Sequence, residues 1–140
     1  MQRIVDEHRE GGVTEFAQGE SFSLSVTPDP HVTVRYAGAS GDFNPIHIDE
    51  DFARKVGLPG RILHGLWTMG LLARAHTDAA GGPDKLKRLS VQFRGMGRLD
   101  QEVVVEGTVR EVNGSVAIVD SEARQGDTRL VRNGVAELQL

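Results

Sequence analysis

The sequence predicts an α+β fold in which a curved antiparallel sheet wraps around one long buried helix. Two patterns carry this prediction. The stretch 65–73 has no charged residue, and its apolar side chains would point all around a helix, which is typical of a helix enclosed by protein. After Gly81 the apolar residues fall at every second position, which is typical of strands with one buried face. A single sheet curled around a central helix is the arrangement of the hot-dog fold, because the sheet is the only element available to cover the helix.

The predicted strands are bounded by turn residues. The segment 21–27 alternates Phe, Leu and Val with serine and forms the first strand. Later strands are expected at 89–93, 102–109, 115–123 and 130–140. Asn-Gly at 113–114 and Gln-Gly-Asp at 125–127 are the predicted turns between the last three strands. This sheet leaves one edge strand and one flank of the helix uncovered, so we expect a second chain to cover them.

Short helices are expected between the first strand and the buried helix. Asp29 is predicted as the N-cap of a helix that begins at Pro30 and runs to about Ala39. A second helix is predicted over 49–56, with an aspartate as its cap and a glycine at its end. Residues 1–20 are polar and interrupted by glycine, so we expect an arm or a short hairpin there. At 140 residues, the whole chain is expected to form a single domain.

The composition narrows the classes of function. The formal net charge of −4 is opposite to the basic surface that nucleic-acid binding needs. The longest apolar run without charge, at about 63–73, is too short to span a membrane. The absence of cysteine excludes disulfides, thiol catalysis and zinc–thiolate sites. The opening MQRIVDEHREGG contains no apolar signal segment, so we expect a cytoplasmic protein with no nucleic-acid or membrane partner.

The segment SGDFNPIHID (40–49) contains the best candidates for acid–base chemistry, Asp42 and His47. Gly-Asp and Asn-Pro are common turn dipeptides, and a turn alone is the simpler interpretation of each residue taken separately. Pro45 fixes its own backbone angle and favours an extended Asn44, however, so the geometry between the acid and the imidazole is stiff. Histidine titrates near neutral pH and a carboxylate can hold a water, so the pair suits proton transfer.

A further candidate lies at the start of the buried helix. Backbone N–H groups there have no helical partner, and Gly65 would let a substrate carbonyl approach closely, so its amide could stabilise an oxyanion. A glycine needed only for tight entry into the helix is an equally good interpretation. His64 is expected to be buried and hydrogen-bonded, whereas His31 and His76 are expected at the surface with no assigned role.

No metal site is expected. The spacing after Asp42 resembles the start of a calcium loop, but the glycine and glutamate that such a loop needs at positions six and twelve are His47 and Ala53 here. A zinc or iron site formed by His47, His64 and a carboxylate stays open as an alternative. The chain has no nucleotide-binding glycine motif, and no cofactor is expected.

The segments YAGASGDFNPIHID (36–49) and GLPGRILHGLWTMG (57–70) together resemble the MaoC-like, (R)-specific enoyl-thioester hydratase family. They are most similar to its small single-hot-dog (3R)-hydroxyacyl-thioester dehydratase subunits. The resemblance implies a hot-dog homodimer, or a heterodimer with a related subunit. It also implies an acyl thioester of coenzyme A or acyl carrier protein as the substrate. The reaction would be reversible addition of water across a trans-2-enoyl thioester to give the (3R)-3-hydroxyacyl product.

The resemblance also assigns roles to particular residues. It makes Asp42 and His47 the catalytic dyad that holds the water. It makes Asn44 the residue that orients their loop, and the backbone amide of Gly65 the oxyanion donor. No cofactor is implied. A hot-dog acyl thioesterase and a non-catalytic subunit that binds acyl thioesters remain alternatives.

Overall fold

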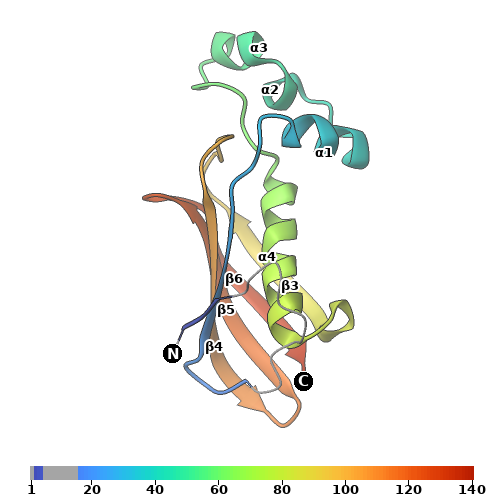
Figure 1. Cartoon of the computed structure of the whole chain (residues 1–140), viewed down its shortest axis with the longest axis vertical. Helices are drawn as coiled ribbons and strands as arrows, with labels where there is room; N and C mark the ends of the chain where they lie inside the picture. The colour runs from blue at the N-terminus through green and yellow to red at the C-terminus, as the bar shows by residue number, and fades with distance from the viewer. Residues whose placement is uncertain (1, 5–15) are drawn as a thin grey trace.

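A six-stranded sheet curls around one long helix in the part of the chain that the computed structural model describes, residues 2–4 and 16–140 (Figure 1). The helix is α4 (Gly65–Ala80). The strands follow the order β1-β2-β4-β5-β6-β3 across the sheet. They are β1 (Gln2–Ile4), β2 (Ser21–Val26), β3 (Leu86–Phe93), β4 (Val103–Asn113), β5 (Val116–Gln125) and β6 (Thr128–Gln139). A short 3₁₀ helix, η1 (Pro83–Lys85), follows α4 and was not predicted.

The glycine turns at 113–114 and 125–127 join long antiparallel strands, as predicted. Gly114 and Gly126 have φ angles of 60° and 54°, a left-handed conformation that suits tight hairpins. Within the predicted arm or hairpin, 1–20, the strand β1 is described and pairs in parallel with β2. The rest of the expected arm or hairpin, 5–15, lies outside the described residues.

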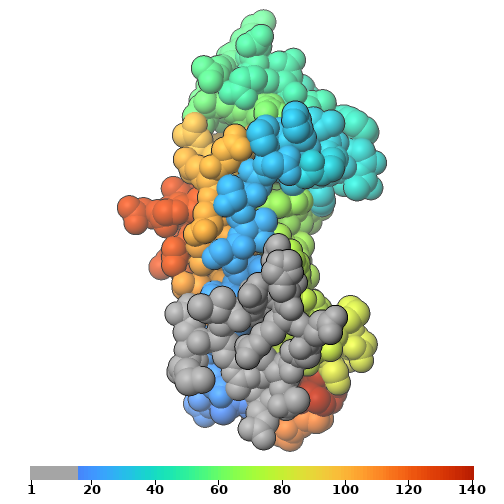
Figure 2. All heavy atoms as spheres, in the orientation of Figure 1, coloured from blue at the N-terminus to red at the C-terminus, as the bar shows by residue number. Residues whose placement is uncertain are grey.

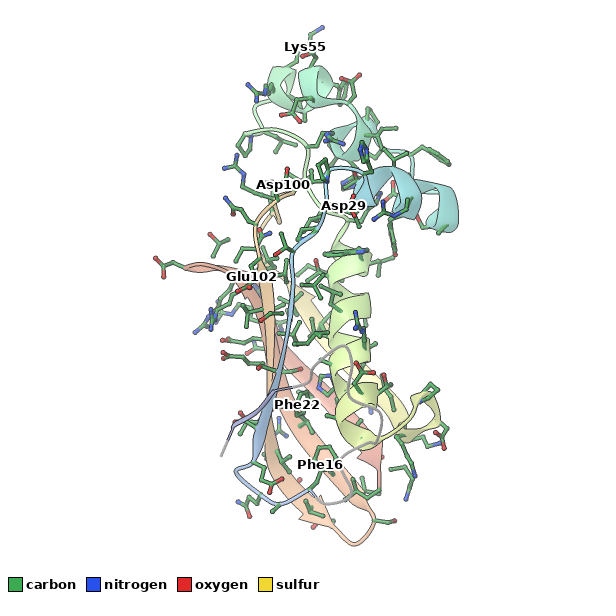
Figure 3. All side chains as sticks on the ribbon, in the orientation of Figure 1. Phe16, Phe22, Asp29, Lys55, Asp100 and Glu102 are labelled. Carbon is green, nitrogen blue, oxygen red and sulfur yellow. The ribbon has the colours of Figure 1, made fainter. Side chains whose placement is uncertain are left out.

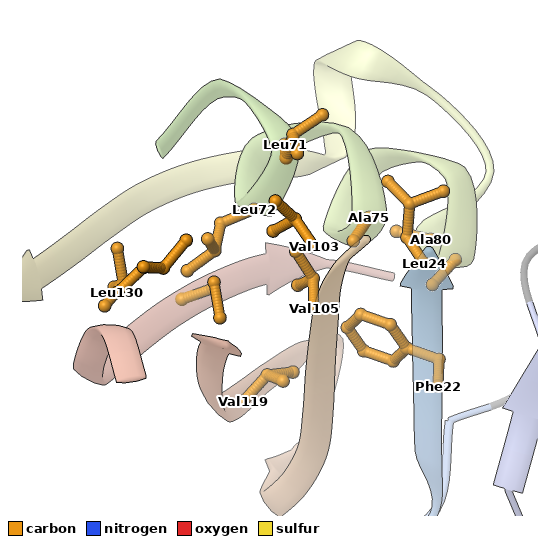
Figure 4. Packing of buried hydrophobic residues seen from close by; sticks show 14 of the residues in the cluster. Phe22, Leu24, Leu71, Leu72, Ala75, Ala80, Val103, Val105, Val119 and Leu130 are labelled. Carbon is orange, nitrogen blue, oxygen red and sulfur yellow. The ribbon is translucent and has the colours of Figure 1, made fainter. Parts of the chain in front are cut away.

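The core lies between α4 and the inner face of the sheet. Figure 4 shows Leu72 and Ala75 of α4 facing Val105 of β4 and Phe22 of β2. These side chains are at most 2% exposed, and burying one such large apolar side chain stabilises the fold by about 1.5–3 kcal/mol. Gly107 of β4 makes room for Phe22, because a Cβ there would lie 2.4 Å from the ring. The alternating pattern that predicted the strands therefore also specifies the packing against the helix.

One flank of α4 is open in the single chain, as predicted, and the other side is buried against the sheet. Leu66 is 61% exposed and Gly70 is also exposed, whereas Leu72 and Ala75 on the opposite side are fully buried. One sheet can cover only one side of a helix, which is why the sequence predicts an uncovered flank. None of the described helices is long and apolar enough to cross a membrane.

Three short helices stand over the N-terminal end of α4 and form a cap on the molecule (Figures 1 and 2). They are α1 (Val32–Ser40), α2 (Pro45–Ile48) and α3 (Glu50–Lys55). The cap begins where Figure 3 shows Asp29 near Asp100, and the Asp100 N–H donates to the Pro28 carbonyl at 2.9 Å. This contact ties the start of the cap to the loop that leads into β4.

The first cap helix starts later than predicted. The Asp29 side chain accepts a hydrogen bond from the His31 N–H at 2.8 Å, so this part of the chain forms a turn and α1 begins only at Val32. The second predicted helix is confirmed as α3, in which Asp49 caps the Phe52 N–H at 3.0 Å. The short helix α2, between them, was not predicted.

Candidate active site

The acid of the SGDFNPIHID segment is placed by the end of α1. Gly41 ends this helix in the left-handed region, with φ of 79°, and its N–H donates to the Ala37 carbonyl at 2.8 Å. The Ser40 hydroxyl then accepts from the Asp42 N–H at 3.1 Å. The Asp42 side chain emerges 53% exposed, so water and small molecules can reach its carboxylate.

The turn residues of this segment hold the acid in place. One carboxylate oxygen of Asp42, Oδ1, accepts from the Asn44 N–H at 3.2 Å. Asn44 Oδ1 in turn accepts from the Ile46 N–H at 3.2 Å and caps α2, in which Pro45 is the first residue. The turn interpretation and the site interpretation are therefore compatible, because the turn is what orients the carboxylate. A functional role of Asn44 stays a prediction.

His47 is buried on α2 and points one ring nitrogen at Asp42. Its Nδ1 lies 2.8 Å from the carbonyl oxygen of Ile62, and a carbonyl can only accept, so Nδ1 carries a proton. The other nitrogen, Nε2, lies 3.8 Å from Asp42 Oδ2. That distance is too long for a direct hydrogen bond but suits one water shared by the two groups. Sequence reasoning missed Ile62, because any residue type can supply a carbonyl.

Two further rings support the pair. The His64 ring is stacked on the His47 ring, with centroids 3.8 Å apart and an angle of 22° between the planes. The Tyr36 ring lies 4.7 Å from the His64 ring and is tilted by 55° to it. His64 is 2% exposed, and its Nε2 lies 3.1 Å from the Asp42 carbonyl oxygen. The prediction of a buried, hydrogen-bonded His64 is confirmed. Tyr36 of α1 was not singled out from the sequence.

The surroundings of His64 favour its neutral form. Burial lowers the pKa of His64, the hydrogen bond to the Asp42 carbonyl raises it, and the neighbouring charge of His47 lowers it further. The net direction is downward from the ordinary value of 6.5. The Nε2 of His64 donates to the Asp42 carbonyl, so in the neutral ring Nδ1 carries no proton. This buried Nδ1 has no hydrogen-bond partner among the described residues.

Gly65 follows directly and begins α4. Its N–H is one of the groups at a helix N-terminus that have no partner within the helix, and the helix dipole favours negative charge there. A Cβ on Gly65 would lie 3.1 Å from the Phe93 ring, so the glycine also serves packing. Both sequence interpretations of Gly65 therefore fit the structure, and a role as oxyanion donor stays a prediction.

The geometry does not favour the metal alternative. The possible ligand atoms of Asp42, His47 and His64 lie within 4.8 Å of one another. The two imidazole rings are stacked nearly parallel, so their lone pairs run side by side and do not converge on one point. His64 Nε2 is also engaged by a backbone carbonyl. A zinc or iron ion would require one ring to turn out of the stack.

The surface assignment of His76 is wrong, whereas His31 is exposed as predicted. His76 is fully buried, with Nδ1 2.5 Å from the Leu72 carbonyl and its ring edge-on to Phe22 at 5.2 Å. The buried positions of α4 are 68, 71, 72, 75, 76, 79 and 80, which is the spacing of one helix face. That spacing could have placed His76 inside, had the helix been extended beyond its charge-free part.

Comparison with known proteins gives the family. The profile described as "MaoC like domain" matches residues 13–129. The chain belongs to this family. The 3-hydroxybutyryl-CoA dehydratase of Methylorubrum extorquens is 34% identical to the MaoC-like chain over 113 residues, which cover 80% of this chain and 68% of that protein. The fatty acid synthase beta subunit aflB of Emericella nidulans is 37% identical over 98 residues, which are 68% of this chain but only 5% of that subunit.

A solved structure confirms the fold. The MaoC-like chain superposes on the (R)-hydratase from A. caviae involved in PHA biosynthesis with a TM-score of 0.83 at 23% identity, covering 91% of this chain and 99% of that one. The predicted hot-dog fold and the predicted MaoC-like membership are both confirmed. The chain spans about a twentieth of the fatty acid synthase subunit that it matches.

Proposed function

We propose that this MaoC-like domain catalyses the reversible hydration of trans-2-enoyl thioesters to (3R)-3-hydroxyacyl thioesters of coenzyme A or acyl carrier protein. The observation that carries the proposal is the 3.8 Å separation of Asp42 Oδ2 and His47 Nε2, which suits one shared water. The similarity to a 3-hydroxybutyryl-CoA dehydratase supports the substrate class. The domain needs no cofactor in this reaction, because both protons come from the water.

The proposed reaction uses one water between the two side chains. Because Nδ1 of His47 donates to the Ile62 carbonyl, its Nε2 is free to take a proton from that water. The water oxygen bonds to C3 of the enoyl group, and the C2–C3 double-bond electrons move toward the thioester oxygen. The dyad then returns the proton to C2, and the second water proton stays on the new hydroxyl group. No other reactant is needed for the atoms to balance.

Gly65 would stabilise the charge that builds on the thioester oxygen. Its N–H stands at the positive end of α4, and it follows directly after His64, whose ring is stacked on His47. A backbone donor directed at a developing oxyanion is worth about 3 kcal/mol of barrier. The dyad and the amide therefore serve the two ends of the same conjugated system.

The first test removes the dyad. Asp42→Asn and His47→Ala should each lower the turnover of crotonyl-coenzyme A by about 100- to 10,000-fold, because each removes a group that holds the water or moves its proton. The measurement is the loss of enoyl thioester absorbance, with circular dichroism to show that the fold is intact. The matched controls Asp51→Asn and His31→Gln change exposed residues and should keep full activity. Turnover near the wild-type value in either dyad variant would refute the assignment.

The same assay separates the alternatives. A thiol-reactive dye would detect the free coenzyme A that a hot-dog thioesterase releases, whereas a hydratase releases none. A chain that binds acyl thioesters without turning them over would be the non-catalytic subunit. Activity that returns only when a related subunit is added would indicate a heterodimer.

We further propose that a second chain, most simply a copy of this one, covers the open flank of α4 and the free edge of β3. Leu66, Phe93 and Met96 are 61%, 47% and 56% exposed. These side chains are larger and more apolar than a lone surface usually shows, and a dimer would bury them. Light scattering during size-exclusion chromatography should give twice 15.2 kDa. Leu66→Glu should lower that mass, and a fully active monomer would contradict the proposal.

A further inference from the structure

His64 occupies the N-cap position of α4 without capping it. Its backbone is extended, with φ of −66° and ψ of 133°, and its side chain makes no capping hydrogen bond. Serine, threonine, aspartate or asparagine here would bond the first turn of the helix. The His64 side chain instead reaches another segment, where Nε2 donates to the backbone carbonyl of Asp42 at 3.1 Å. The side chain at this position therefore serves a contact outside its own helix.

The His64 ring also restrains His47. His47 is held by the Ile62 carbonyl at Nδ1 and by the His64 ring across its face, at 3.8 Å between centroids. Tyr36 also contacts the His64 ring, at 4.7 Å between centroids, and limits its movement. The His64 side chain contacts both members of the dyad, and the next residue in the chain supplies the Gly65 amide. His64 therefore links the dyad to Gly65.

We propose that His64 is a positioning residue that holds Asp42, His47 and the Gly65 amide at a fixed separation. This inference rests on the proposed hydratase function for its kinetic test. His64 acts through its neighbours: the hydrogen bond fixes the Asp42 backbone, and the stack fixes the plane of His47. Proton transfer and oxyanion stabilisation must act on one substrate at once, and a misplacement of about 1 Å can cost about 100-fold in rate.

His64 must be neutral in this role, with its proton on Nε2. A proton on the buried, unpartnered Nδ1 would make the ring a cation stacked against His47, next to the nitrogen that is to accept a proton from water. Burial lowers the pKa of His64 and so favours the neutral ring. The carboxylate of Asp42 lies within 4.8 Å of a ring nitrogen of each histidine, and the Tyr36 ring of α1 contacts the His64 ring.

Two substitutions separate the hydrogen bond from the stack. His64→Phe keeps a ring against His47 but removes the donor to the Asp42 carbonyl. His64→Gln keeps an N–H donor at a similar reach but removes the ring. We expect kcat to fall by about 10- to 100-fold in His64→Phe with KM changed less than about threefold, because binding is retained while alignment is lost. The loss of kcat should be smaller in His64→Gln, because glutamine keeps a donor to the Asp42 carbonyl.

The controls make the result specific to positioning. His31→Gln removes an exposed histidine and should leave kcat unchanged. Thermal unfolding should show that the His64 variants remain folded at the assay temperature. Wild-type kcat in His64→Phe, or an equal loss in kcat and gain in KM across both variants, would overturn the proposal.

A spectroscopic measurement on the wild-type protein needs neither a variant nor turnover. Nitrogen-15 NMR of the histidine side chains should show His64 neutral and protonated on Nε2 at pH 6, where an ordinary histidine is mostly charged. Protonation on Nδ1, or a charged ring at that pH, would overturn the positioning role. An inactive wild-type protein with the expected His64 signal would instead refute only the hydratase function, so the two failures are distinguishable.

Discussion

The two ends of α4 each carry a buried histidine, and their surroundings are opposite. His64, at the N-terminal end, contacts other elements: the Asp42 backbone, the His47 ring and Tyr36. His76, near the C-terminal end, bonds the Leu72 carbonyl of its own helix and has an aromatic ring at its edge. The residue type and the degree of burial are nearly the same at the two positions.

The difference shows that burial alone does not make a histidine functional. Burial is the leading cause of a lowered pKa at both His64 and His76, but only His64 is also influenced by charged neighbours. Only at its end of the helix do a half-exposed carboxylate, a second imidazole and an unpaired helix amide lie together. What identifies a site is therefore the set of groups that a buried histidine joins.

Beyond the dyad itself, the largest effect expected at the two ends of α4 is a loss of turnover in Gly65→Pro, at the N-terminal end. Proline is tolerated at the first position of a helix, and the extended backbone of His64 is the conformation that a residue before proline prefers. The substitution removes the N–H that is proposed to bind the thioester oxygen. The proline ring also fills the space beside it. We expect turnover of crotonyl-coenzyme A to fall by about 100- to 1,000-fold.

Gly65→Ala is the matched control for this variant. It adds the same Cβ, 3.1 Å from the Phe93 ring, but keeps the N–H. The ratio of turnover in the alanine and proline variants therefore separates the loss of the amide from the crowding by Cβ. Equal turnover in the two variants would contradict an oxyanion role for Gly65 and leave packing as its only role.

Much of the fold could be predicted because its signals are local. Alternation of apolar residues predicted the strands, and Gly114 and Gly126 marked hairpins whose φ angles few other residues adopt. The start of α1 was misplaced because Asp29 can cap a helix or close a turn, and the sequence does not decide between these two hydrogen bonds. His76 was misplaced because the prediction of burial was applied only to the charge-free part of the helix, 65–73, and not to the helix face that continues to position 76.

The candidate site was predictable only in part. Asp42 and His47 share one short loop, so their proximity follows from the chain itself. The partner of His47 Nδ1 is a backbone carbonyl at Ile62, fifteen residues away, and no residue preference marks such a carbonyl. Tyr36 and His64 meet only after the cap folds onto α4, so their contact depends on tertiary structure.

A smaller effect is expected at the C-terminal end, where His76→Leu should alter stability rather than catalysis. Burial lowers the pKa of His76 below its ordinary value of 6.5, so the folded protein keeps the ring neutral while the unfolded chain takes up a proton below about pH 6.5. The free energy of unfolding of the wild-type protein should therefore fall as the pH falls through this range. The slope from one such histidine is at most about 1.4 kcal/mol per pH unit.

Urea unfolding measured between pH 5 and pH 8 tests this prediction. His76→Leu removes a buried ring whose Nε2 has no partner among the described residues, so it should flatten the fall below about pH 6.5. Above that pH the free energy of unfolding should differ from the wild-type value by less than about 1.5 kcal/mol, since Leu is of similar size and apolar. Turnover at neutral pH should be unchanged, because the hydrogen bond and the ring contact of His76 are made to Leu72 and Phe22, which are not part of the proposed site. An unchanged slope, or a large loss of turnover in a folded His76→Leu protein, would mean that the two ends of α4 are not as different as their surroundings indicate.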